Sequence, residues 1–162
     1  MKNLQLGRLE VSLTPGAITL RGRIDDAAPI SSLVDECAPG TPVTIDTDGV
    51  TFVNSIGVRE WMRLLRGLVA KGCRLTLVRV ADVLMTQMNM IPDAKQSANV
   101  ASFHAQYVCN ACGAEAAPVV DAVAHQEALA QLQAPSLPCP ECGAAMELGD
   151  YPERYLSIFA KS

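Results

Sequence analysis

Four of the six cysteines stand in two pairs with the spacing of metal ligands. Each pair reads Cys-x-x-Cys-Gly, and 26 residues separate Cys109 and Cys112 from Cys139 and Cys142. Two thiolates so close in sequence can hold one metal ion from a single tight turn, and the glycine permits the backbone that the turn needs. Four sulfur ligands suit tetrahedral Zn²⁺ and leave no open coordination position. The pattern predicts a structural zinc site, with iron or a redox dithiol pair as alternatives.

Short elements are expected around these cysteines. Strands are predicted near both pairs, at 103–108, 118–123 and 146–148, and the arrangement resembles a zinc ribbon, in which two metal-binding turns clamp a small sheet. Residues 124–133 favour a helix and are interpreted as an insertion within the 26-residue spacer. A short C-terminal helix is expected from Pro152, with Tyr155, Leu156 and Phe159 facing inward. His104 and His125 are not expected to be ligands, because the four cysteines already complete the set.

Strand-like and helix-like patterns alternate before the cysteine pairs. Alternating apolar residues predict strands at 4–13 and 17–24 on either side of a Thr-Pro-Gly turn. Further elements are predicted in the order short helix, strand, helix, strand and helix, at 29–37, 42–53, 54–71, 73–80 and 81–90. This alternation predicts an α/β fold with helices packed on a mixed sheet.

Charge divides the chain into two parts. Residues 1–98 carry eleven basic and ten acidic residues, whereas residues 99–162 carry two basic and seven acidic ones. The second part also contains the four paired cysteines. We therefore expect an α/β domain at 1–98 and a small metal-binding module at 99–162, whose folding depends on the metal because its core is small.

The first part resembles the STAS family, the sulfate transporter and anti-sigma-factor antagonist domains. The resemblance covers roughly residues 5–98 and rests on the segment VTIDTDGVTFVNSIGVREW at 43–61, followed by a helix, Gly72 and a strand. Asp46, Ser55 and Gly57 match the family pattern, as does Gly22 in an early strand. The resemblance implies a mixed sheet and a regulatory, protein-binding role.

Two positions depart from the family pattern. Asn54 stands where the family usually has aspartate, and Ile56 stands where it has the hydroxyl that a kinase partner phosphorylates. Isoleucine has no oxygen that could accept a phosphoryl group, so the familiar switch is expected to be absent. Ser55 precedes a helical run and is expected to be its N-cap, with phosphorylation of Ser55 as the alternative.

A surface for a partner is predicted at the start of the helix at 54–71. Three arginines recur on one side of this helix, at Arg59, Arg63 and Arg66. They form either a plain solvated face or an electrostatic rim for an acidic protein. The resemblance implies that the residues opening the helix take part in partner binding. The complete expected set is Asn54, Ser55, Ile56, Gly57, Arg59, Arg63 and Arg66.

Composition limits the function classes. The 162 residues carry a net charge of −4 and include neither an apolar run long enough to span a membrane nor a common catalytic motif. We expect a cytoplasmic, non-enzymatic module that binds a regulatory protein in bacterial signalling, such as an anti-sigma-type kinase or ATPase. Alternatives are an accessory subunit of a membrane transporter, a nucleic-acid binder and a thiolate redox sensor. The acidic second part disfavours nucleic acid.

Overall fold

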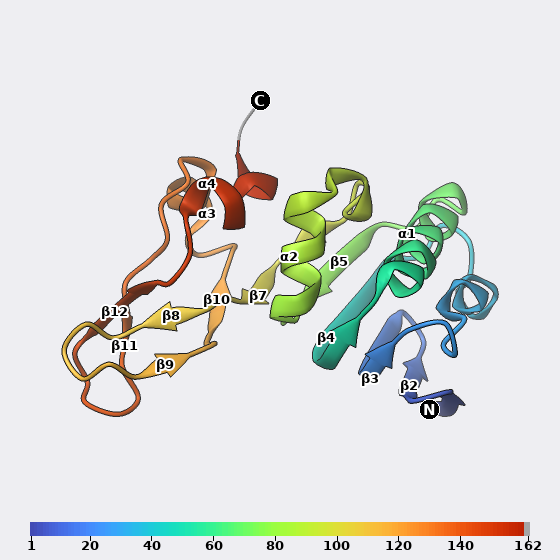
Figure 1. Ribbon diagram of the computed structural model, residues 1–162. Helices are drawn as coiled ribbons and strands as arrows, with labels where there is room; N and C mark the ends of the chain where they lie inside the picture. Colours follow the sequence, from blue (N-terminus) through green and yellow to red (C-terminus); the bar gives the residue numbers. More distant parts are fainter. Residues whose placement is uncertain (161–162) are drawn as a thin grey trace.

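The computed structural model describes residues 1–160, and its largest element is a six-stranded mixed sheet (Figure 1). The strands lie in chain order; β2 is antiparallel to both neighbours, and β3 to β6 are parallel. Their bounds are β1 (Lys2–Leu6), β2 (Leu9–Thr14), β3 (Ala17–Ile24), β4 (Val43–Val53), β5 (Leu75–Val78) and β6 (Asn99–Val100).

Two helices connect parallel strands and lie on one face of this sheet (Figure 1). Helix α1 (Ser55–Ala70) joins β4 to β5, and α2 (Asp82–Met90) leads from β5 towards β6. The short 3₁₀ helices η1 (Ile30–Glu36) and η2 (Pro92–Ala94) complete this layer. No helix formed by residues 1–160 combines the length and the apolar character that crossing a bilayer requires.

Buried and half-buried side chains alternate along the strands, so the sheet has one face covered by helices and one more open face. In β4, Val43 and Ile45 are buried under the helices, whereas Thr44 and Asp46 between them are half-buried on the other face. Thr19 and Thr76, on the neighbouring strands, continue this half-buried face. The expected α/β class, with helices packed on a mixed sheet, is confirmed.

One predicted strand proves to be two. The run at 4–13 turns back at Gly7 and Arg8, so that Leu6 pairs with Leu9 and β1 and β2 form a hairpin. A Gly-Arg pair is a weaker turn signal in sequence than the Pro15-Gly16 pair that connects β2 to β3 as expected. Strand β4 contains a bulge, because its register with β3 shifts between Asp46, the partner of Thr19, and Gly49, the partner of Arg21.

Small sheets follow in the second part of the chain. Strands β7 (Ser102–His104) and β10 (Val119–Asp121) form one antiparallel pair. A four-stranded antiparallel sheet has the order β11 (Leu137–Pro138), β12 (Ala145–Leu148), β8 (Tyr107–Val108) and β9 (Glu115–Ala116). The predicted strand at 103–108 is thus divided between two sheets. The remaining elements are α3 (Gln126–Ala130), α4 (Pro152–Tyr155) and η3 (Ser157–Phe159).

The two parts of the chain share one hydrophobic core. Strand β6 belongs to the first sheet although it lies after residue 98, and Phe103 forms a parallel bridge with Val80. Phe103 and Tyr107 are buried in the same cluster as Leu77 and Val80. The second part therefore packs directly against the first. Lys161 and Ser162, which end the expected module, lie outside the described residues.

Candidate metal centre and helix surface

Two matching turns carry the paired cysteines. In the first turn, which links β8 to β9, the Gly113 amide donates to the Cys109 carbonyl and the Cys109 amide donates to the Ala114 carbonyl, both at 2.8 Å. The turn between β11 and β12 repeats these bonds with Cys139 as the first residue. Gly113 and Gly143 have φ values of 78° and 76°, a left-handed backbone that glycine adopts most easily. The role expected for the glycines is confirmed.

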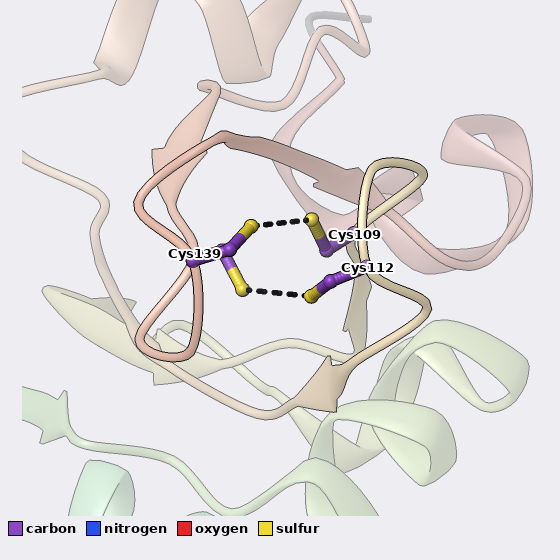
Figure 2. A group of neighbouring side chains, drawn as sticks. Cys109, Cys112 and Cys139 are labelled. Carbon is purple, nitrogen blue, oxygen red and sulfur yellow. Dashed lines mark hydrogen bonds between the residues drawn. The ribbon is translucent and has the colours of Figure 1, made fainter.

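These turns bring the four sulfur atoms together (Figure 2). All four lie within 4.8 Å of one another, and the pairs across the turns are closer: Cys109 to Cys142 at 3.6 Å and Cys112 to Cys139 at 3.7 Å. Cys109 and Cys139 are buried, whereas Cys112 and Cys142 are exposed. The four predicted ligands are close enough to hold one metal ion.

The Cys109 thiol of the cluster ionises more readily than an ordinary cysteine. A hydrogen bond from the Cys112 backbone amide lowers the pKa of the Cys109 thiol to about 7, against the opposing effect of burial. Because the thiolate is the form that binds metal, Cys109 can supply a ligand near neutral pH. The Cys139 sulfur accepts a hydrogen bond from the Glu141 amide at 3.4 Å.

The two histidines stay outside this cluster. Among residues 1–160 the group of potential metal ligands consists of the four cysteines alone. His104 instead contacts the Ala117 carbonyl oxygen through Nδ1 and the Asp48 carboxylate through Nε2. The His125 carbonyl accepts a hydrogen bond from the Leu129 amide at the start of α3.

The residues of the predicted partner surface have different surroundings. Asn54, not Ser55, is the N-cap of α1, and its side-chain oxygen accepts a 2.8 Å hydrogen bond from the Gly57 amide. The prediction for Ser55 is wrong by one residue, because the extended backbone that precedes the helix ends at Asn54. Gly57 is buried against Ile24, where an added Cβ would lie 1.9 Å from the carbonyl oxygen.

The exposed members form one patch on α1. Ser55 and Ile56 open the helix, and Ile56 is 46% exposed, unusual for a large apolar side chain. Arg59, Arg63 and Arg66 are all exposed along the same helix. Arg63 lies 3.5 Å from the carboxylate of Glu60, which is itself buried.

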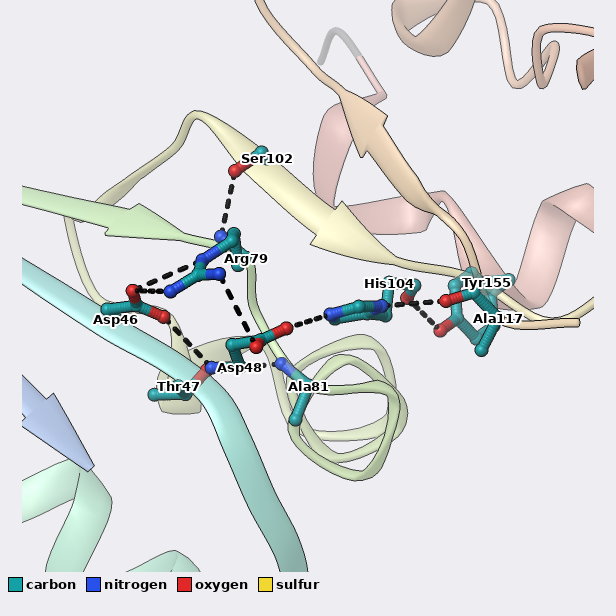
Figure 3. Close-up of polar contacts among 9 residues, drawn as sticks. All are labelled: Asp46, Thr47, Asp48, Arg79, Ala81, Ser102, His104, Ala117 and Tyr155. Atoms are coloured by element: carbon teal, nitrogen blue, oxygen red, sulfur yellow. Dashed lines mark hydrogen bonds and ion pairs between the residues drawn. The ribbon is translucent and has the colours of Figure 1, made fainter. Parts of the chain in front are cut away.

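Sequence reasoning missed a polar network at the junction of the two parts (Figure 3). The Arg79 guanidinium contacts the carboxylates of Asp46 at 2.5 Å and Asp48 at 3.4 Å. Asp48 also contacts His104, whose carbonyl oxygen lies 2.8 Å from the Tyr155 hydroxyl. The two residues of each contact are between 31 and 56 positions apart in the sequence. No local sequence pattern therefore predicts these contacts. Arg79, which makes the contacts with Asp46 and Asp48, has a left-handed backbone with φ 45°.

Comparisons with known proteins found no matching family model, no matching curated protein and no matching solved structure. The arguments for a function therefore rest on the cysteine cluster and on the exposed start of α1.

Proposed function

We propose that the four cysteines hold a structural Zn²⁺ ion in a zinc-ribbon-like module. With Zn–S bonds of about 2.3 Å, a regular tetrahedron places its sulfurs about 3.8 Å apart. Two of the sulfur pairs, at 3.6 and 3.7 Å, are near that value, which supports the assignment. Four thiolates complete the coordination of the ion, so its chemistry is to crosslink two turns rather than to activate a substrate.

Metal analysis of the purified chain tests this assignment. We expect one zinc per chain, and Co²⁺ in its place should give the absorption of tetrahedral thiolate coordination. Cys112→Ser and Cys142→Ser should each weaken binding strongly, whereas Cys37→Ser is the matched control because Cys37 lies outside the cluster. Binding that survives both cluster substitutions would exclude the four-cysteine site.

We further propose that the protein is a non-enzymatic, STAS-like regulatory module that binds a protein partner. The sequence resemblance supports this, as does the order of β4, α1, Gly72 and β5, which agrees with the order of elements in the family pattern. One difference is that the family pattern has its aspartate at the end of a strand, whereas Asp46 lies within β4.

The observation that carries the proposal is the exposed Ile56 beside arginines on α1. An apolar side chain at the centre and cations at its edge form the usual plan of a protein interface, in which burial supplies affinity and charge supplies specificity. Arg59, Arg63 and Arg66 would favour an acidic partner surface. A partner of the anti-sigma type, a kinase or ATPase, is consistent with the resemblance.

Regulation of this proposed interaction would not use a phosphate at position 56. Because Ile56 has no hydroxyl, partner concentration or assembly would control the complex. Ser55 is the nearest exposed hydroxyl, at the first residue of α1. Stoichiometric phosphate on Ser55 in protein isolated from cells would contradict control by concentration alone.

Capture of the partner from native cells, followed by binding measurements with the purified pair, tests the interaction. The combined variant Arg59→Ala, Arg63→Ala and Arg66→Ala should weaken binding about tenfold or more, and added salt should weaken the wild-type complex. Arg74→Ala, at an exposed position before β5, is the control. Capture of a transporter complex, or a salt-dependent mobility shift with nucleic acid, would favour the alternative functions.

A further inference from the structure

The end of the described chain lies along α2 as a strap, defined here as Pro152–Ala160. At one end, the Tyr155 hydroxyl lies 2.5 Å from Asp82 Oδ1 and 2.8 Å from the His104 carbonyl oxygen. At the other end, Asn89 Oδ1 accepts hydrogen bonds from the Ser157 hydroxyl at 2.9 Å and the Ile158 amide at 3.1 Å. The strap thus contacts both the first and the last turn of α2.

These contacts define one stripe of α2. Asp82, Met85 and Asn89 are spaced at i, i+3 and i+7, and therefore lie on the same side of the helix. Met85 is fully buried between the two polar anchor points, whereas Met90 at the end of the helix is 62% exposed. The strap is accordingly positioned to cover the side of α2 that carries Met85.

The strap is too short to fold on its own. Its helices, α4 and η3, contain four and three residues, far below the length at which an isolated helix is stable. Tyr155 and Leu156 are buried, and the Phe159 ring lies 5.1 Å from the Phe103 ring. Docking therefore depends on these contacts and on the element from which the strap extends.

That element is held by the cysteine turns. Strand β12 begins three residues after Cys142 and ends four residues before α4, and its partner β8 ends directly before Cys109. Glu147 pairs with Val108, and the Gly149 amide donates to the Gln106 carbonyl at 2.8 Å. Crosslinking of the two turns thus fixes the strand from which the strap leaves.

We propose that the strap is a metal-dependent cover of α2. With an ion on the four cysteines, β12 stays paired with β8 and the strap stays docked on Asp82 and Asn89. Loss of the ion frees the strand, releases the strap and exposes the Met85 stripe, while the first sheet remains folded. Metal occupancy then determines whether this apolar side of α2 is available. The inference rests on the proposed metal centre.

Pulsed hydroxyl-radical footprinting of the whole chain, before and after removal of the metal by a chelator, tests the cover. The reporter is Met85, the control for the integrity of the first part is the buried Trp61, and the exposed reference is Met90. Metal content is measured on both samples. We expect oxidation of Met85 to rise at least about threefold without metal and that of Trp61 to stay unchanged.

A substitution in the strap tests its contact with α2 without removing the metal. Tyr155→Phe retains the ring and removes the hydroxyl, so the loaded protein should retain its zinc but show increased oxidation of Met85. Tyr151→Phe is the matched control, because Tyr151 is 71% exposed and precedes the strap. The same rise in both variants would contradict the role of the Tyr155 hydroxyl.

The remaining outcomes are distinct. A loaded protein that loses its zinc without any change at Met85 would overturn the cover and leave the metal centre intact. A joint rise at Met85 and Trp61 would mean general unfolding and would also overturn the cover. A purified chain that never holds metal would overturn both proposals.

Discussion

At the scale of single residues, the cysteine sulfurs of the proposed metal centre would connect protonation to metal binding. The pKa of the Cys109 thiol is lowered to about 7, below the ordinary value for cysteine. A thiol that binds metal must first lose its proton, so protons and metal compete for the same sulfurs. Below pH 7, more than one ligand has to release a proton when the ion binds.

The apparent zinc affinity should therefore fall by more than about tenfold for each pH unit below 7. Competition with a chelator of known affinity, repeated from pH 8 to pH 5, measures this. An affinity that does not change over this range would contradict binding by thiolates.

Gly57 has a packing role at the start of α1. An added Cβ would lie 1.9 Å from the Ile24 carbonyl oxygen, and backbone on both sides would have to shift. Gly57→Ala should therefore lower the free energy of unfolding by about 3 kcal/mol, although alanine favours helix. Urea unfolding measures the change.

The matched control in the same helix is Gly67→Ala. There the added Cβ would meet a side-chain atom, Val34 Cγ2 at 2.7 Å, and no backbone atom is among its nearest neighbours. We expect a change of less than about 1 kcal/mol, since the gain in helix propensity offsets the contact. Equal losses at both positions would argue against the close approach at Ile24.

At the scale of elements, α1 begins at Asn54, and this separates the cap from the neighbouring hydroxyl. The Asn54 side chain bonds to the Gly57 amide, whereas Ser55 is exposed in the first turn. The helix therefore needs Asn54 for its stability and leaves Ser55 available at the surface.

Asn54→Ala should lower the free energy of unfolding by about 1 kcal/mol, because an amide of the first turn loses its acceptor. Ser55→Ala should change it by less than about 0.5 kcal/mol. Thermal unfolding of both variants measures the difference, and a larger loss for Ser55→Ala would show that serine is the true cap.

At the scale of the whole molecule, the two parts of the chain are joined by more than a linker. Strand β6 completes the first sheet, Phe103 shares its core, and Arg79 binds Asp46 and Asp48 beside His104. The second part depends on strands of two to four residues, whereas the first sheet includes β3 with eight residues and β4 with eleven, and two helices cover it.

Removal of metal should therefore loosen the elements from β8 to the strap and spare β2 to β5. Amide hydrogen exchange should show loss of protection at β8 and β12, with the amides of β3 and β4 unchanged. Exchange that accelerates equally in β3 and β12 would show that the whole chain unfolds as one unit.

Local patterns determined much of this protein. The paired cysteines, the turn glycines, α1, α2 and the mixed α/β class follow from spacings within a few residues, because helix periodicity, strand alternation and the reach of a tight turn are local properties. The predicted cap was displaced from Asn54 to Ser55 because neighbouring polar residues are equally good caps in sequence, and only the backbone selects one.

Tertiary structure alone decided that Arg79 meets Asp46, that Tyr155 reaches Asp82 and that residues after 98 complete the first sheet. Such contacts join residues far apart in the chain, and they form only where the packing of whole elements brings them together.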